Sequence, residues 1–174
     1  MTPAEEGADK WTKDMTKEQQ IAYMKEKIMP AMDPVFKAHD AKAFEKRADC
    51  ITDQYSGYSP LPGVNLNGKL TLGENTADNG GLRIAYMALL DTLAGKPTPK
   101  IDGYTPQQRL FLNWGQVWCT NETDAYLRLQ AAINPHSPAR HRVNGVVSNM
   151  PEFQQAFQCK PGHPMVRKDP CRVW

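Results

Sequence analysis

Apolar residues recur at helical spacing along most of the chain, and stretches rich in glycine and proline divide them into segments. In residues 39–55, for example, Phe44, Ala48 and Ile51 share one stripe, which predicts that they face inward. The segments 56–69 and 95–103 are rich in turn residues and predict loops. The pattern predicts helices at 16–29, 39–55, 72–93, 105–119, 122–133 and 151–158, and an irregular segment at 134–149 with a short strand at 143–147.

The helix predicted at 72–93 carries two acidic residues, Glu74 and Asp78, at its start. Four residues advance a helix by about 400° and roughly 6 Å, so the two carboxylates point nearly the same way. Gly81, Leu82 and Ala85 follow on that stripe, which predicts that it faces inward. Buried acids require partners, and a metal ion or a histidine is suitable. The alternative is that both acids only complement the helix dipole.

Glycines flank these acids at positions 73, 80 and 81. Glycine inside a helix costs about 1 kcal/mol relative to alanine. A helix that tolerates two adjacent glycines is therefore expected to have a close neighbour at that point. This expectation argues against the alternative that Glu74 and Asp78 only complement the helix dipole.

Composition narrows the class of protein. The 174 residues suffice for one domain, and the contents of 40% hydrophobic and 23% charged residues are ordinary for a globular protein. A net charge of +2 and the lack of a basic run interleaved with aromatics argue against nucleic-acid binding. No apolar run approaches the roughly 20 residues of a membrane-spanning helix. The acidic start of the chain is not typical of a signal peptide.

Four cysteines, at positions 50, 119, 159 and 171, favour an oxidising compartment. They allow three pairings, and none of them forms a Cys-x-x-Cys zinc motif. The alternative is four reduced, buried thiols in a cytosolic protein.

Three blocks of uncommon residues follow one another between Asp40 and Trp174. They are Asn67-Gly68, Thr71-Leu72-Gly73-Glu74-Asn75, Ala77-Asp78-Asn79-Gly80-Gly81-Leu82 and Ala85-Tyr86; Gln116-Val117-Trp118-Cys119, His136-Ser137-Pro138, Arg142-Val143-Asn144-Gly145, Asn149, Pro151-Glu152-Phe153 and Ala156-Phe157; and Cys171-Arg172-Val173-Trp174. Together they resemble the second zinc-site motif and the carboxyl-terminal part of the neprilysin family of zinc metallopeptidases. Thr76 stands where that motif usually has isoleucine.

The resemblance implies roles for individual residues. Glu74 would be the third protein ligand of a catalytic zinc ion, beside two histidines. Asp78 would accept a hydrogen bond from a ligating histidine. His136 would stabilise the oxyanion formed at the substrate carbonyl, and Arg142 would bind a backbone carbonyl of the substrate. His141 has no matching role and is expected to be a surface residue.

The resemblance also implies that Cys50 and Cys171 form a disulfide. The family cysteines matching Cys119 and Cys159 bond to partners in the amino-terminal part, so these two thiols are expected to be unpaired here.

The family's His-Glu-x-x-His motif, which supplies two zinc ligands and the general base, does not occur among the 174 residues. The four histidines, at positions 39, 136, 141 and 163, are not arranged in that pattern. We therefore expect a mainly α fold, the carboxyl-terminal helical part of a thermolysin-like zinc metallopeptidase catalytic domain, over residues 40–174. Residues 1–39 carry no clear match.

The implied function is zinc metalloendopeptidase activity of the neprilysin type, with one zinc ion at a site that is incomplete in this chain. The expected partners are peptide substrates and the amino-terminal part of the same enzyme, without nucleic acid or a membrane segment. The isolated chain is expected to be inactive, and its location to be secreted or periplasmic. The alternative is a non-catalytic truncated or degenerate relative that acts as a binding or structural module.

Overall fold

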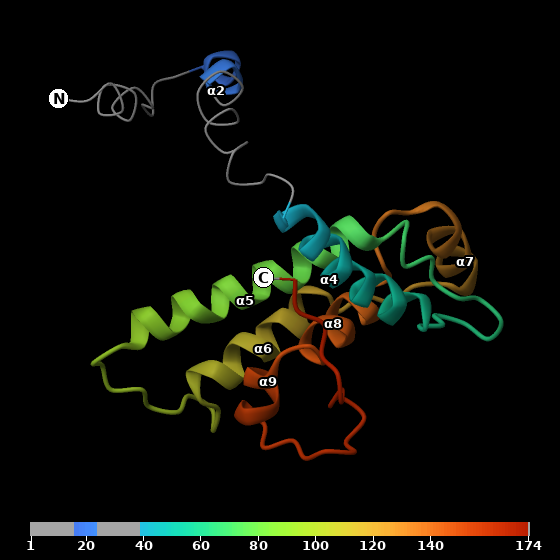
Figure 1. The fold of residues 1–174 in the computed structure, drawn as a ribbon. Helices are drawn as coiled ribbons and strands as arrows, with labels where there is room; N and C mark the ends of the chain where they lie inside the picture. The colour runs from blue at the N-terminus through green and yellow to red at the C-terminus, as the bar shows by residue number, and fades with distance from the viewer. Residues whose placement is uncertain (1–15, 24–38, 174) are drawn as a thin grey trace. The chain divides into compact units, whose positions relative to one another are not determined.

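The computed structural model describes residues 16–23 and 39–173 (Figure 1). The chain divides into two compact units, Met1–Glu45 and Lys46–Trp174. In the first unit, helix α2 (Lys17–Tyr23) begins at a capping box, in which Thr16 N–H donates to Gln19 Oε1 at 2.8 Å and Gln19 N–H to Thr16 Oγ1 at 3.3 Å. Residues 24–29 of the helix predicted at 16–29 lie outside the described residues.

Helix α4 (His39–Ser56) runs from the first unit into the second. The second unit then contains α5 (Leu72–Leu93), α6 (Pro106–Val117), α7 (Asp124–Ile133), α8 (Ala139–Val147) and α9 (Pro151–Ala156). In the part of the chain that the structure describes there is no sheet, and two isolated bridges, Leu61 with Val64 and Ile101 with Tyr104, close loops. The predicted mainly α fold is confirmed.

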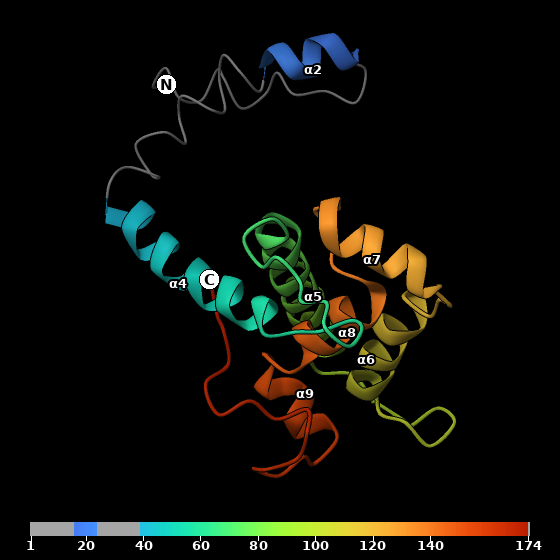
Figure 2. The ribbon, with the colours of Figure 1, turned by 90° about the vertical axis from the view of Figure 1, so that its right-hand side faces the viewer.

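Helices α5 and α8 pack against each other, and α6 packs against α5, α8 and α9. Figure 2 looks nearly along α5, which lies beside α8 with α4 to one side and α6 and α7 to the other. Helix α6 starts at a second capping box, formed by Thr105 and Gln108, with Pro106 at its first position. The pairing of α5 with α8 matters most here, because it joins the first of the three blocks of motif residues to the second.

The irregular segment with a short strand at 143–147 is a wrong prediction, because residues 139–147 form helix α8. Three valines and a glycine within nine residues have low helix propensity, which suggested a strand. Packing overrides that preference: Val146 is fully buried and Val147 is 2% exposed.

Two hydrophobic clusters form the core. One joins Ile51 and Tyr55 of α4 to Leu66, Cys171 and Val173. The other gathers Leu82 of α5, Phe111 of α6, Val146 and Val147 of α8, and Met150, which directly precedes α9. Ala48 and Ile51 are buried as predicted. The prediction for Phe44 is wrong: its side chain is 43% exposed, because the first cluster contacts only the later turns of α4.

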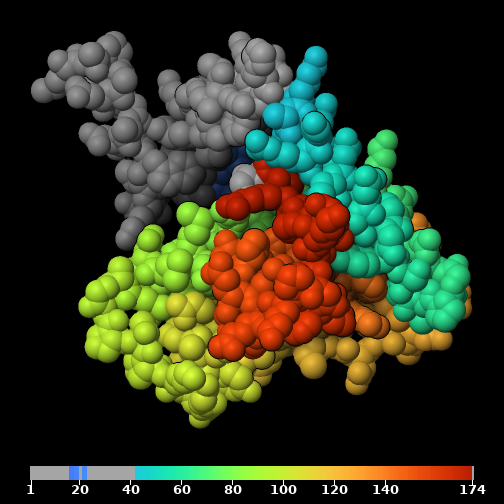
Figure 3. Space-filling view, turned by 60° about the horizontal axis from the view of Figure 1, so that its bottom comes forward, coloured from blue at the N-terminus to red at the C-terminus, as the bar shows by residue number. Residues whose placement is uncertain are grey.

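The segment that ends at Val173 lies beside α4 (Figure 3). A disulfide joins Cys50 to Cys171, the pairing implied by the resemblance, and Arg47 Nη1 donates to the Val173 carbonyl at 3.1 Å. Cys119 and Cys159 are free thiols. The disulfide therefore attaches this segment to the first core cluster.

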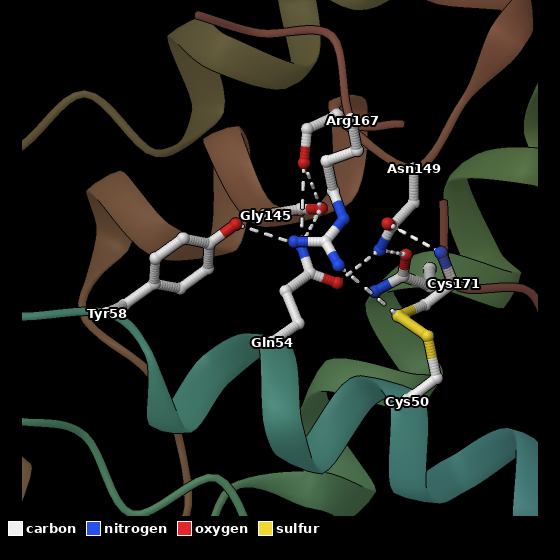
Figure 4. The surroundings of a disulfide bond; sticks show 9 residues. Cys50, Gln54, Tyr58, Gly145, Asn149, Arg167 and Cys171 are labelled. Atoms are coloured by element: carbon white, nitrogen blue, oxygen red, sulfur yellow. Dashed lines mark hydrogen bonds between the residues drawn. A yellow bond between two sulfur atoms is a disulfide. The ribbon is translucent and has the colours of Figure 1, made fainter. Parts of the chain in front are cut away.

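Buried amides surround the disulfide (Figure 4). Asn149 Nδ2 donates to Gln54 Oε1 at 2.7 Å and to Asn79 Oδ1 at 2.9 Å, and Asn149 Oδ1 accepts from the Cys171 backbone N–H at 2.9 Å. Gln54 Nε2 in turn donates to the Gly145 carbonyl at 3.0 Å. These bonds tie α4, α5 and α8 to the disulfide-linked segment.

Candidate active site

Helix α5 presents Glu74 and Asp78 from its first two turns, as the spacing predicts. The Asp78 side chain is 9% exposed, in agreement with an inward stripe, but Glu74 remains 43% exposed. Gly81 and Ala85 are also exposed, contrary to the prediction, whereas Leu82 is buried. The buried stripe thus includes Asp78 and Leu82 and leaves Glu74 at its edge, open to solvent.

His136 faces Glu74 from the loop that joins α7 to α8. Its Nε2 lies 3.2 Å from Glu74 Oε2. Behind the ring, Asn134 Oδ1 accepts from the His136 backbone N–H at 2.9 Å and lies 3.0 Å from Nδ1. Because the backbone nitrogen can only donate, its contact fixes the orientation of the Asn134 amide, and the Asn134 side chain holds the His136 ring from its Nδ1 edge. The Nε2 edge of the ring is therefore directed at the site.

Arg142, in the first turn of α8, forms a bidentate pair with Asp78. Its Nε donates to Asp78 Oδ2 and its Nη2 to Oδ1, each at 2.7 Å. The face of the guanidinium stacks on Trp118, with Cζ 3.9 Å from the centroid of the ring. Both charged side chains are largely buried, so the pair is well shielded from solvent. The Nη1 group of Arg142 is not used by Asp78 and can donate to another acceptor.

The structure thus brings all four predicted site residues into two adjoining pairs, Glu74 with His136 and Asp78 with Arg142. The sequence argument treated Asp78 and Arg142 separately and did not pair them. Each Asp78 oxygen still has a second lone pair, so the carboxylate retains the capacity to accept from a further donor.

The neighbours of the motif glycines differ from the prediction. A Cβ atom added at Gly73 or Gly81 would meet nothing within 4 Å, so neither position is required by close packing. Gly80, which the sequence argument did not place on the inward stripe, is buried. Close approaches occur at Gly68, where an added Cβ would collide with the Thr52 carbonyl oxygen, and at Gly145 of α8, where it would lie 2.6 Å from Tyr55 Cζ.

His141 is not a surface residue, contrary to the prediction. It is 8% exposed, and its ring lies against Tyr58 with the centroids 5.2 Å apart. Burial, and secondarily the charge of Arg140, lowers the pKa of His141 to about 4. The error arises because residues 134–149 were predicted to be irregular, and an irregular segment has no predictable buried face. In helix α8, position 141 lies on the buried face.

Sequence reasoning missed the supporting residues Asn75, Trp118, Asn134 and Ser137. Asn75, Trp118 and Ser137 belong to the blocks that carry the resemblance, but their residue types alone do not predict contacts. Asn134 had a weak signal, since an asparagine directly before Pro135 is typical of a turn.

The residues described here do not complete a zinc site by themselves. No group of three His, Cys, Asp or Glu side chains that could hold a metal ion occurs among residues 16–23 and 39–173. Glu74 offers one half-exposed carboxylate, and a tetrahedral catalytic site requires three protein ligands. The two further ligands of a zinc ion would have to come from outside the described residues.

Comparison with known proteins identifies the class. The sequence model of peptidase family M13 matches residues 17–173, so the match begins upstream of residue 40. The chain belongs to this family of metallopeptidases.

Relatives and solved structures agree with this assignment. Neprilysin-3 of Drosophila melanogaster is 47% identical over 135 residues, which cover 75% of this chain and 17% of the relative. Endothelin-converting enzyme 1 of Cavia porcellus is 42% identical over 145 residues, 81% of this chain and 19% of the relative. The chain spans about a fifth of the length of these curated relatives.

The fold is that of M13 zinc metalloproteases. The crystal structure of the Mycobacterium tuberculosis zinc metalloprotease ZMP1 with an inhibitor superimposes with a TM-score of 0.72 and 38% identity. The superposition covers 76% of this chain and 21% of that protein. The helical part of a zinc metallopeptidase catalytic domain that we expected is therefore confirmed as the fold class.

Proposed function

We propose that this chain supplies the third zinc ligand and the substrate-contacting residues of a neprilysin-type zinc metalloendopeptidase. The observation that supports this most directly is the convergence of Glu74, His136, Asp78 and Arg142 at one edge of the α5–α8 interface. These residues come from two separate sequence blocks and meet as pairs. A family match over residues 17–173 supports the same activity.

Each residue has a chemical task in this proposal. Glu74 is the carboxylate ligand, and its half-exposed position leaves it accessible to a metal ion. A zinc ion held there with two further ligands would supply an activated water. His136 directs Nε2 towards the same point, where it can stabilise negative charge that develops on a substrate carbonyl oxygen.

Arg142 is the proposed contact for the substrate backbone. Asp78 and Trp118 hold its guanidinium from the edge and the face, so it is oriented before any substrate arrives. The Nη1 group then donates to a peptide carbonyl, which positions the scissile bond. Asp78 has the additional proposed task of accepting from a zinc-ligating histidine.

The expected partners are peptide substrates and the part of the enzyme that carries the His-Glu-x-x-His helix. The Cys50–Cys171 disulfide favours a secreted or periplasmic location. Within the described ranges, no helix has the length and apolar character needed to cross a membrane.

A chimera tests the proposal. Residues 40–173 replace the matched segment of a full-length M13 relative that carries the His-Glu-x-x-His helix, and zinc content and hydrolysis of a short fluorogenic peptide are measured. We expect one bound zinc ion and peptide cleavage. Glu74→Gln should abolish both, because the amide cannot replace the anionic ligand. Asp78→Asn should lower the rate by roughly 10–100-fold, the usual effect of disturbing a residue behind the ligands.

The matched control is Glu122→Gln, which removes another partly buried glutamate outside the site. It should leave zinc content and rate unchanged. A chimera in which Glu74→Gln behaves like Glu122→Gln would show that Glu74 is only a helix-end acid.

The second candidate is a non-catalytic relative that acts as a binding module. The lack of a His-Glu-x-x-His motif among the 174 residues favours it for the isolated chain. We expect the pure 174-residue chain to bind zinc weakly and to have no peptidase activity. Robust zinc-dependent cleavage by that chain would contradict this expectation.

A further inference from the structure

Directly behind the Glu74–His136 pair, a second contact joins the same two segments. Ser137 Oγ donates to Asn75 Oδ1 at 2.8 Å. Each of these residues is the next in sequence after a member of the site pair. Asn75 is fully buried and Ser137 is 1% exposed, whereas Glu74 and His136 each leave 43% of their side chains exposed. The buried bond thus lies inside the protein and the site pair at its surface.

Asn75 is suited to this position by having both a donor and an acceptor. Its Nδ2 donates to Thr71 Oγ1 at 2.9 Å, and the Thr71 hydroxyl donates to the Asn67 carbonyl at 3.1 Å. The amide oxygen is left for Ser137. Aspartate lacks the donor and leucine lacks both groups, so either would leave a buried partner unsatisfied. The relay therefore fixes the plane of the Asn75 amide.

The exposed Glu74–His136 pair constrains the two segments less than the buried Ser137–Asn75 hydrogen bond does. An exposed ion pair is weak, because water screens it and both side chains lose freedom when it forms. A buried hydrogen bond with satisfied partners is stronger and more restrictive. The segment that carries His136 is thereby fixed against α5 by Ser137, while Asn134 orients the His136 ring from behind.

We propose that Asn75 is a positioning residue that, through Ser137, sets the place of His136 relative to Glu74. This inference rests on the proposed function and extends it, because it assigns a task to two residues that touch neither metal nor substrate. Loss of the bond frees residues 134–138 to shift against α5. His136 then samples positions in which Nε2 no longer faces the reacting oxygen, while Arg142 keeps its own anchors.

The test uses Asn75→Ala, Ser137→Ala and the double variant, first in the chimera described above. Each single variant should lower kcat by about 10–100-fold with little change in KM. The double variant should be no slower than the slower single variant, because both remove the same bond. The matched control is Ser148→Ala, which also removes a buried serine hydroxyl, one bonded to the Gly145 carbonyl at 3.0 Å.

Ser148→Ala should reduce stability in a similar way but leave kcat unchanged, which separates positioning from a general loss of stability. Equal kcat values for Ser137→Ala and Ser148→Ala would overturn the inference.

A second readout does not depend on catalysis. In the 174-residue chain, NMR signals of the His136 ring nitrogens should shift or broaden in Ser137→Ala and remain unchanged in Ser148→Ala. Identical His136 signals in both variants would also overturn the inference. If the unsubstituted chimera is inactive but the NMR difference is present, the proposed function fails and the positioning role of Asn75 stands.

Discussion

At the scale of single residues, Thr76 carries a polar group that the fold does not use. Its side chain is 6% exposed, and its buried hydroxyl has no hydrogen-bond partner. It occupies the position that is usually isoleucine in the motif it resembles. A buried hydroxyl without a partner costs free energy that an apolar group of the same shape avoids.

We therefore expect Thr76→Val to raise the free energy of unfolding by about 1 kcal/mol, as measured by urea denaturation. Thr92→Val on the same helix is the control. The Thr92 hydroxyl donates to the Ala88 carbonyl at 2.8 Å and is exposed, so its removal should be neutral or slightly destabilising. A loss of stability in Thr76→Val would show that its hydroxyl is solvated in solution.

The buried His141 predicts how stability depends on pH. Its pKa is about 4 in the folded chain and about 6.5 when unfolded, so between these values the unfolded chain binds the extra proton. The contribution of neutral His141 to the free energy of unfolding is therefore fully present above about pH 6.5. It is lost as the pH drops towards 4, which lowers that free energy by up to about 3 kcal/mol. Protonation is unfavourable because the ring is buried and Arg140 adds a positive charge nearby.

His141→Phe keeps an aromatic ring against Tyr58 and should remove this pH dependence. Unfolding free energies at about pH 4.5 and about pH 7.5 should then differ less than in the unsubstituted protein. His163→Phe alters an exposed histidine and should leave the difference intact. An unaltered pH profile in His141→Phe would mean that other groups cause the acid sensitivity.

At the scale of elements, two helical glycines with opposite surroundings give a paired prediction. An alanine Cβ at Gly81 in α5 would meet open space, whereas at Gly145 in α8 it would collide with the buried ring of Tyr55. Gly81→Ala should stabilise the protein by up to about 1 kcal/mol. Gly145→Ala should destabilise it by about 2 kcal/mol or more, because the added Cβ would overlap the fully buried Tyr55 ring. Thermal and urea unfolding of both variants provide the measurement.

These two helices also show what the sequence could and could not predict. The bounds of α5 agree with the predicted 72–93, because a long segment with clear turn residues on both sides leaves little ambiguity. Helix α8 was missed because its residues have low intrinsic helix propensity and burial decides their conformation. The candidate site residues were predictable by resemblance, but their pairing was not, since it depends on how α5 meets α8.

At the scale of the whole molecule, the Cys50–Cys171 disulfide spans a sequence separation of 121 residues. In the chain-entropy estimate, a bridge over such a loop stabilises the folded state by roughly 4–5 kcal/mol as an upper figure. We expect Cys171→Ala to lower the unfolding free energy by several kcal/mol, up to about that figure. Cys159→Ala, which changes a free and partly buried thiol, serves as the control.

Mass mapping of the non-reduced protein identifies the pairing. A dominant Cys50–Cys171 peptide is expected, with Cys119 and Cys159 available to alkylation. A dominant bond from Cys50 to Cys119 or Cys159 would contradict the structure and the expected effect of Cys171→Ala.

The order of the cysteines along the chain has a consequence for biosynthesis. As the polypeptide leaves the ribosome, Cys50 emerges first and its native partner Cys171 last of the four. Cys119 and Cys159 become available earlier, so an oxidant acting on the nascent chain meets two wrong partners before the right one. Thiol exchange takes seconds to hours, which is slow compared with helix formation and packing. Correct oxidation of this protein should therefore depend on a disulfide isomerase, or on α4 and α5 folding quickly enough to shield Cys50 until synthesis reaches residue 171.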